Sequence, residues 1–213
     1  MMRENKRTLM IASIVTLLPI VIGVIFWNRL PDVMAVHFGT DNEANGFSSK
    51  AFTVFGIPVI CLALLWAGAW ITAHDPRKQY ISPKMYRLVL WIVPVISLIV
   101  VGTIYPYNLG YEMDIMRISQ LVIGILFVII GNYLPKARRN YTIGIRLPWT
   151  LANEENWNRT HRIGGYLWVI GGLFMIIMAL TGLGRAGWSI GLIVVIALVP
   201  CIYSCWMHVK CGL

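Results

Sequence analysis

Charged residues are scarce in this chain of 213 residues: 13% are Asp, Glu, Lys or Arg, whereas 58% are apolar. Soluble globular domains carry about 25% charged residues, so this composition excludes an ordinary water-soluble domain. Cysteine is scarce as well, and the four cysteines lie within or beside apolar runs rather than in polar loops. That placement excludes an extracellular disulfide framework. The composition is that of a chain solvated by lipid.

Six runs contain no charged side chain and are 17 to 23 residues long. A helix that rises about 1.5 Å per residue needs about 20 apolar residues to cross about 30 Å of hydrocarbon. Transmembrane strands would instead be short and would alternate in polarity. We therefore predict an all-α, polytopic membrane protein with six transmembrane helices, in residues 8–27, 51–73, 88–107, 118–134, 163–183 and 186–207.

Lysine and arginine collect on alternate loops. With the N-terminus inside, 14 of the 18 lysines and arginines fall on inner segments, which leaves four outside: Arg29, Lys50, Arg117 and Arg185. Cytoplasmic loops of membrane proteins carry the excess of positive charge, so we expect both termini in the cytoplasm. The net charge of +9 then marks a membrane face that attracts anionic lipid, and we expect no direct nucleic-acid partner.

The predicted spans contain no ionisable acid or base. An ionised side chain near the bilayer centre costs at least about 2.5–3.5 kcal/mol, so proton- and ion-coupled carriers keep such groups only where their chemistry needs them. The sequence therefore disfavours a coupled transporter. Glycines predict close packing of the last two spans, since small residues let helix backbones approach. These glycines are Gly164, Gly165, Gly171 and Gly172 in the fifth span and Gly187 and Gly191 in the sixth.

The longest outer loop, residues 28–50, contains a histidine, an aromatic ring and two acids, which are His37, Phe38, Asp41 and Glu43. A histidine with two carboxylates is a conceivable metal site. A polar loop folded over the helix ends is the interpretation that we prefer. We predict no metal and no cofactor for the chain.

The longest cytoplasmic loop, residues 135–162, is the richest in unusual residues. Asn153 followed by two acids predicts a helix start, because its side chain meets unpaired amides and the acids oppose the helix dipole. That helix should continue into the fifth span. Trp157 and His161 are four residues apart and share a face, over which we expect Trp149 to close. Pro148 disfavours helix at the residue before it.

Two interpretations of this loop stay open from the residues alone. The first is a docking surface for an acidic or aromatic partner, and the second is an anchor among lipid headgroups. A catalytic role is disfavoured, because no nucleophile with an adjacent base is visible. The candidate docking residues are Gly144, Arg146, Pro148, Trp149, Thr150, Trp157 and His161.

The same loop resembles a known family. The matching residues include Gly131-Asn132-Tyr133-Leu134-Pro135-Lys136, Gly144-Ile145-Arg146, Pro148-Trp149-Thr150-Leu151 and Thr160-His161-Arg162. In this spacing they resemble the SdpI immunity-protein family. The segment from Leu30 to the second span is similar to a short membrane domain of unknown function that commonly precedes it. We accordingly expect a two-span unit, residues 1–80, and a four-span SdpI-like unit, residues 81–213.

The resemblance implies a multi-pass protein of the bacterial plasma membrane that protects its producer against a secreted membrane-active peptide toxin. It further implies signal transduction, in which the protein recruits a cytoplasmic repressor. The outer residues named above would then face the toxin. Two alternatives are a small-molecule or peptide transporter or exporter, and a membrane enzyme that acts on a lipid-linked substrate through His161 with Glu154 or Glu155. We do not expect an enzyme.

Overall fold

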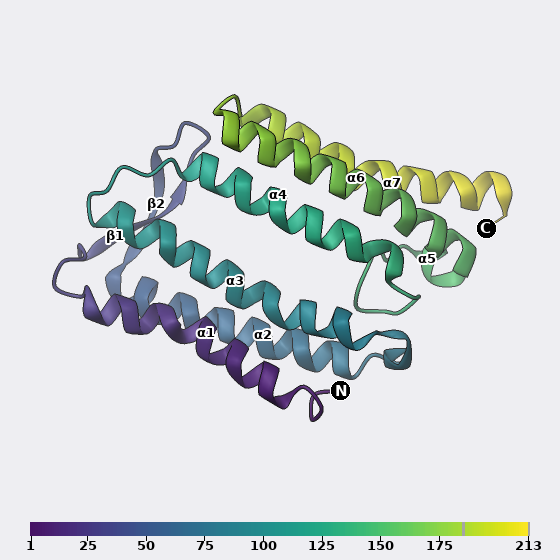
Figure 1. Ribbon diagram of the computed structural model, residues 1–213, viewed down its shortest axis with the longest axis horizontal. Coiled ribbons are helices and arrows are strands. Elements are labelled where there is room, and N and C mark those ends of the chain that lie inside the picture. Colours follow the sequence, from purple (N-terminus) through teal and green to yellow (C-terminus); the bar gives the residue numbers. More distant parts are fainter. Residues whose placement is uncertain (185, 213) are drawn as a thin grey trace. The chain divides into compact units, whose positions relative to one another are not determined.

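The computed structural model describes residues 1–184 and 186–212; Arg185, which the topology prediction places outside, lies outside the described residues. Within this part of the chain, six helices are long and apolar enough to cross a membrane, which confirms the predicted class (Figure 1). They are α1 (Lys6–Ile25), α2 (Ile57–Ala73) together with the helical turn before it, α3 (Pro83–Asn108), α4 (Ile115–Tyr133), α6 (Glu154–Thr181) and α7 (Ala186–Cys211). The cytoplasmic location of the termini stays a prediction.

Short elements join these helices. A hairpin of β1 (Val33–Phe38) and β2 (Ala44–Ser49) follows α1, and a π-helical turn, Phe52–Gly56, leads into α2. Two 3-10 turns, Lys78–Tyr80 and Leu134–Lys136, follow α2 and α4. The five-residue helix α5 (Pro148–Ala152) precedes α6.

The described chain forms two compact units. The first consists of residues 1–73 and 86–115, and the second of residues 74–85 and the described residues from 116 onward. The division at residue 80, drawn from the family resemblance, stays a prediction about domain organisation.

In the first unit, the core lies where the hairpin meets the helices. Its buried side chains are Leu30, Met34, Val54, Val101, Ile104 and Tyr105. The hydroxyl of Tyr105 donates to the Pro19 carbonyl of α1 at 3.2 Å, and Ser97 of α3 donates to the Thr16 carbonyl at 3.1 Å. These bonds satisfy polar groups that lipid cannot satisfy, so they hold α3 against α1.

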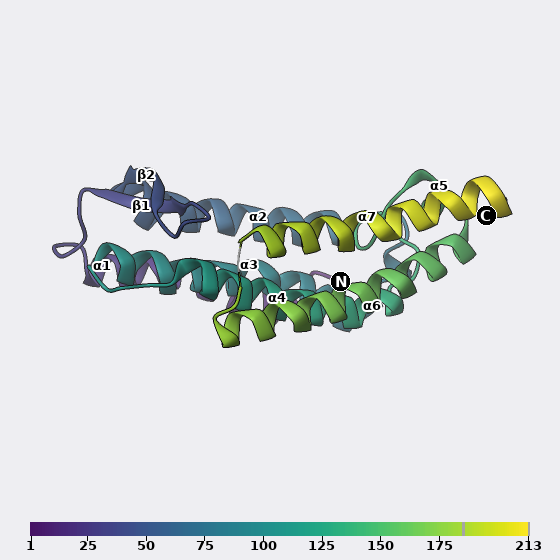
Figure 2. The ribbon, with the colours of Figure 1, turned by 90° about the horizontal axis from the view of Figure 1, so that it is seen from above.

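The hairpin is antiparallel and irregular, with bulges on either side of His37. His37 pairs with Gly46, where an added Cβ atom would lie 2.7 Å from the His37 Cβ, so the pairing needs glycine. Asn108, at the end of α3, accepts from the Ala35 N–H at 2.8 Å and donates to the Ala35 carbonyl at 3.0 Å. Its amide thus takes the place of a neighbouring strand and ties β1 to α3. Figure 2 shows the hairpin near the start of α2.

In the second unit, glycines bring α4 and α6 together. A Cβ atom added at Gly172 would lie 2.5 Å from the Gly124 carbonyl oxygen, and one added at Gly131 would lie 2.9 Å from the Gly165 carbonyl oxygen. The two glycines on each helix are seven residues apart, which places them on one face of it. We call these four residues the glycine seam.

The predicted packing of the last two spans is partly right. Helices α6 and α7 pack side by side, with Gly171 against Ile196 and Gly164 facing Pro200 (Figure 2). Gly187 and Gly191 do not contribute, however, since a Cβ atom at either position would meet nothing within 4 Å. Sequence reasoning assigned all six glycines to this contact, whereas two of them pack α6 against α4.

Candidate functional site

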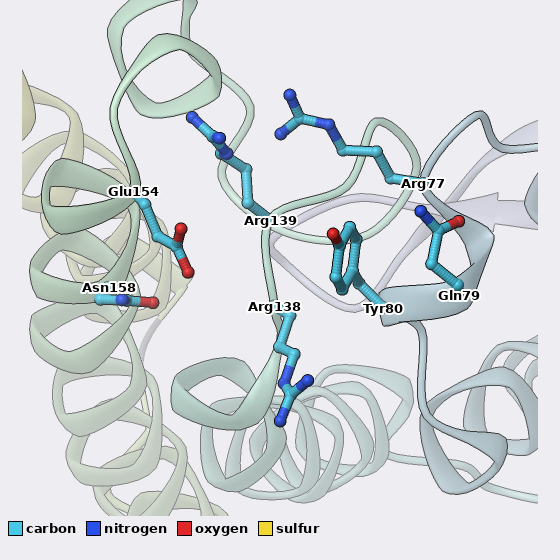
Figure 3. Close-up of a pocket in the computed structure, with 7 residues that line it drawn as sticks. All are labelled: Arg77, Gln79, Tyr80, Arg138, Arg139, Glu154 and Asn158. Atoms are coloured by element: carbon cyan, nitrogen blue, oxygen red, sulfur yellow. The ribbon is translucent and has the colours of Figure 1, made fainter.

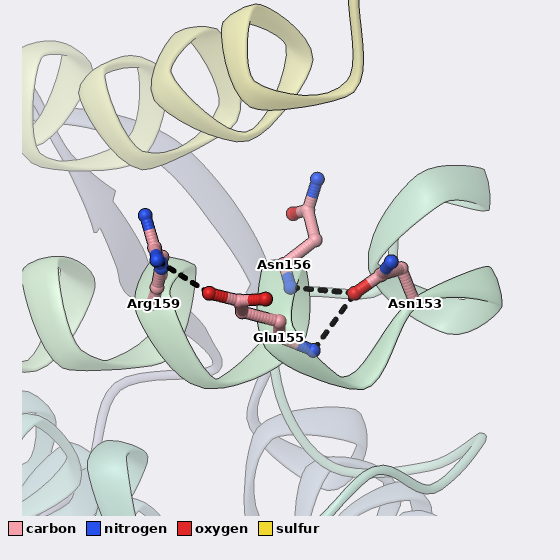
Figure 4. Close-up of polar contacts among 4 residues, drawn as sticks. All are labelled: Asn153, Glu155, Asn156 and Arg159. Carbon is pink, nitrogen blue, oxygen red and sulfur yellow. Dashed lines mark hydrogen bonds and ion pairs between the residues drawn. The ribbon is translucent and has the colours of Figure 1, made fainter. Parts of the chain in front are cut away.

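The loop that precedes α6 is organised around the first turns of that helix. The Asn153 side chain accepts hydrogen bonds from the Glu155 and Asn156 N–H groups at 2.8 and 3.0 Å, as predicted (Figure 4). Glu155 also forms an ion pair with Arg159 on the solvent-exposed face. These contacts fix the point at which α6 begins.

Behind this cap, Trp157 and His161 stack with ring centroids 3.9 Å apart, and both side chains are fully buried. The Trp157 indole N–H donates to the Ala137 carbonyl at 2.7 Å. Because the Ile145 N–H donates to His161 Nε2 at 2.9 Å, that nitrogen carries no proton. The other ring nitrogen, Nδ1, lies 2.7 Å from the Trp157 carbonyl and therefore donates to it. His161 is thus a neutral ring that joins loop to helix.

This arrangement disfavours the enzyme alternative. Both ring nitrogens of His161 are used in hydrogen bonds to the backbone, and the ring is inaccessible to solvent. Glu154 and Glu155 are exposed, and the carboxylate of Glu155 is paired with Arg159. A general acid or base needs to reach its substrate, which His161 cannot do in this position.

Gly144 lies directly above the stacked rings. Its φ of 121° is one that other residues rarely adopt, and an added Cβ atom would overlap His161 Nε2 and lie 3.1 Å from the Trp157 ring. The structure therefore explains the glycine by both backbone conformation and space.

Trp149 does not close over Trp157 and His161, so that prediction is wrong. It stacks instead on His208 of α7, with ring centroids 5.8 Å apart. The reason is α5, which the sequence analysis did not predict. Its first turn begins at Pro148, after an extended Leu147, and the Thr150 hydroxyl accepts from the Leu147 N–H at 2.8 Å. This short helix carries Trp149 toward α7.

Two buried polar residues outside the predicted set hold the loop in shape. Asn140 accepts from the Thr142 and Ile143 N–H groups and donates to two loop carbonyls. Asp75, in the loop before α3, accepts from the Tyr141 N–H at 2.9 Å and the Thr142 hydroxyl at 2.7 Å. The one sequence signal for a structural role of Asp75 is local. An Asp side chain often accepts from the backbone N–H two residues later, which here is that of Arg77.

A third polar cluster joins α6 to α7. Asn156, fully buried, donates to the Ser204 carbonyl at 3.0 Å and accepts from the Ser204 and Thr160 hydroxyls. Sequence reasoning missed Asn156 and Ser204, because a lone amide and a serine 48 residues away give no pattern.

The structure divides the candidate docking residues into two groups. Thr150, Trp157 and His161 are buried and build the scaffold of the loop. Arg146 and Pro148 are exposed, whereas Gly144 and Trp149 are half-buried. Arg146 donates through Nη1 to the Tyr141 carbonyl at 2.8 Å. The role of all seven residues in docking stays a prediction.

In the first unit, the candidate toxin-facing residues lie on the hairpin. His37, Asp41 and Glu43 are exposed, and His37 Nδ1 bonds the Asn45 side chain at 2.5 Å. Phe38 is half-buried and meets Tyr107 edge-on, with ring centroids 4.7 Å apart. Asp41 and Glu43 share the hairpin turn, where the Asp41 carboxylate accepts from the Glu43 N–H at 3.1 Å.

A cleft of about 590 Å³ lies between this hairpin and the end of α3. Its lining is mixed, with apolar and aromatic side chains, the amides Asn42 and Asn108, and the acid Glu43. Two of the apolar side chains, Val33 and Phe47, are each 63% exposed. Such a cleft suits a ligand that is apolar and cationic at once. Sequence reasoning did not find Phe47, Tyr107 or Asn108, because it did not predict strands here.

Comparisons with known proteins match both parts of the chain. Residues 136–204 match the SdpI/YfhL protein family. The predicted resemblance to the SdpI family is confirmed. Residues 14–62 match a domain of unknown function, DUF1648. Immunity protein SdpI of Bacillus subtilis (strain 168) is 27% identical over 173 residues, which cover 79% of this chain and 80% of that protein.

No solved structure matches the chain. The SdpI match covers α5, α6 and much of α7, and therefore includes the stacked Trp157 and His161 pair and the Asn156 cluster. Together with the six apolar helices, the similarity to SdpI supports a multi-pass membrane protein.

Proposed function

We propose that this protein is a bacterial plasma-membrane immunity protein, which protects its producer against a secreted membrane-active peptide. The observation that carries the proposal is the similarity to immunity protein SdpI over 79% of the chain. The six apolar helices are consistent with action in the membrane itself. Positive charge concentrated on alternate loops supports an orientation with both termini and the 135–162 loop in the cytoplasm.

In this orientation the hairpin faces outside and meets the toxin. Cationic and amphipathic peptides are attracted to the acidic turn at Asp41 and Glu43, while their apolar side chains enter the cleft beside Phe47. The hairpin is held in place from two sides. Asn108 bonds β1, and Lys50 at the end of β2 bonds the Trp27 and Leu30 carbonyls and pairs with Asp32. A fixed surface loses less entropy on binding.

On the cytoplasmic side, the 135–162 loop docks a soluble partner, for which a repressor is the candidate. The proposal is supported by the hydrogen bonds that hold the loop, which involve the buried residues Asn140, Asp75 and His161. Because of these bonds, the exposed residues Arg146 and Pro148 have fixed positions. A partner that binds a pre-formed surface does not have to order it.

A protection assay tests the proposal. The double variant Asp41→Asn/Glu43→Gln, expressed in a sensitive bacterium, should lower the tolerated concentration of membrane-active peptide at unchanged protein abundance. Glu112→Gln is the matched control, since Glu112 is an exposed acid of the same unit that does not line the cleft. If wild type gives no protection against any of a panel of secreted peptides, the immunity function is wrong. If protection survives the double change, the toxin is recognised elsewhere.

A further inference from the structure

A pocket of about 620 Å³ in the second unit has no part in the function proposed above. It lies between two loops and the start of α6 (Figure 3). The loop before α3 contributes Arg77, Gln79 and Tyr80, the loop after α4 contributes Arg138 and Arg139, and α6 contributes Glu154 and Asn158.

The pocket has an excess of positive charge. Three guanidinium groups and one carboxylate, that of Glu154, line it. The two neighbouring acids do not neutralise the arginines: Glu155 pairs with Arg159, and Asp75 is buried among backbone N–H and hydroxyl donors. Three cations gathered around one concave surface repel one another, and an anion in the pocket relieves that repulsion.

Two of the arginines are held in position. The backbone N–H of Arg77 donates to Asp75 at 2.7 Å, and its guanidinium lies over the Tyr141 ring, 5.2 Å from the centroid. Arg139 donates through Nη1 to the Ala152 and Leu151 carbonyls at the end of α5, at 2.7 and 3.2 Å. This uses one of its three guanidinium nitrogens. A ligand that binds here therefore meets donors that are already ordered.

The donor set indicates the chemical class of the anion. Guanidinium groups bind two oxygens of a phosphate or carboxylate in parallel. In Figure 3 the guanidinium groups of Arg77 and Arg139 lie on one side of the pocket, whereas the Arg138 side chain extends in the opposite direction, with Tyr80 between Arg138 and Arg77. A tetrahedral phosphate offers oxygens in several directions, whereas a carboxylate offers two in one plane. Guanidinium donors on two sides of one pocket therefore suit phosphate better than carboxylate.

The size of the pocket and Glu154 add a second criterion. A volume of about 620 Å³ exceeds that of a bare phosphate ion and admits a substituted one. Glu154 and Asn158 can then accept hydrogen bonds from a hydroxyl or ammonium group of the substituent. We propose that this pocket binds a phosphate group, which belongs either to a phospholipid headgroup or to a soluble phosphate. The inference does not rest on the immunity function.

Binding to the purified full-length protein in a non-ionic detergent tests the proposal. Two probes are titrated at constant ionic strength: inorganic phosphate, and short-chain phosphatidylglycerol. We expect saturable binding of at least one of them. Arg138→Gln should weaken it about tenfold or more, the loss expected for one charge-assisted hydrogen bond. Glu154→Gln should tighten it, because it removes the one carboxylate that faces the ligand.

The matched control is Arg162→Gln, which removes the same charge from an exposed position outside the pocket. Saturation by inorganic phosphate supports a soluble ligand, and saturation by the lipid alone supports a headgroup. The proposal is overturned if wild type binds neither probe, or if Arg162→Gln weakens binding as much as Arg138→Gln. Binding of an acidic peptide such as deca-glutamate in place of both probes also overturns it, in favour of a protein partner. Arg138 is exposed, so its variant should fold; Arg77→Gln provides a second test.

Discussion

Replacing Gly144 by alanine tests whether the 135–162 loop is held by its contact with His161. The added Cβ atom takes up space that His161 Nε2 and the Trp157 ring already fill, and it does so at a φ of 121°. A sparsely populated backbone conformation costs about 1–3 kcal/mol, and overpacking a tight site costs about 1–3 kcal/mol more. We expect a loss of about 2–6 kcal/mol in the free energy of unfolding, from the same two terms.

Two other glycines separate these terms. Gly182 ends α6 with a φ of 71°, but a Cβ atom there meets nothing within 4 Å. Gly182→Ala should therefore cost only the backbone term, about 1–2 kcal/mol. Gly187→Ala has neither a left-handed backbone nor a neighbour within 4 Å, so it should be close to neutral. The difference between Gly144→Ala and Gly182→Ala measures the overlap with the rings.

Thermal unfolding in detergent, followed by tryptophan fluorescence, is the assay. A change of 1 kcal/mol shifts the midpoint by about 2–4 °C for a chain of this length, so Gly144→Ala should lower it by at least about 4 °C. Adding His161→Ala should then cost less in the Gly144→Ala background than in wild type, because the ring that clashes is gone. Equal midpoints for Gly144→Ala and Gly182→Ala would refute the reasoning.

Two further predictions concern packing and topology. Gly172→Leu should destabilise the protein by at least about 1–3 kcal/mol, since the leucine side chain would push against the Gly124 backbone. Gly187→Leu should be tolerated. Equal unfolding midpoints for these two variants would contradict the role of the glycine seam in packing. Reporter fusions after Lys50 and Asp114 should report outside, and fusions after Pro83 and Asn153 inside; reversal at any two of these sites would break the proposed orientation.

The spans could be predicted from sequence, because the cost of burying charge in lipid marks them directly. The shortest predicted run, residues 118–134, begins earlier in the structure, where α4 starts at Ile115. Arg117 falls within α4, where its guanidinium donates to the Ala179 and Leu180 carbonyls near the end of α6. A charged residue that satisfies a helix end does not terminate a span. The start of α6 at Asn153 was predictable for a local reason, the capping side chain.

The hairpin and the inner contacts of the loop could not be predicted, because they depend on partners far away in the sequence. The strands β1 and β2 have little alternation of apolar and polar residues, and Asn108, which orders β1, lies 73 residues from Ala35. The position of Trp149 was predicted wrongly because the five residues Pro148–Ala152 gave no sign of a separate helix. Local patterns predict elements well and long-range polar pairs poorly.

Asp75 has a consequence for any attempt to transplant the motif. Its carboxylate accepts from the Arg77 N–H in its own turn and from the Tyr141 N–H, which lies 66 residues away from Asp75 in the sequence. A synthetic peptide or a chimera that carries only residues 135–162 lacks this acceptor, and leaves the Tyr141 N–H and the Thr142 hydroxyl without their partner. The portable unit is therefore discontinuous, and a graft has to include both loops to reproduce the native surface.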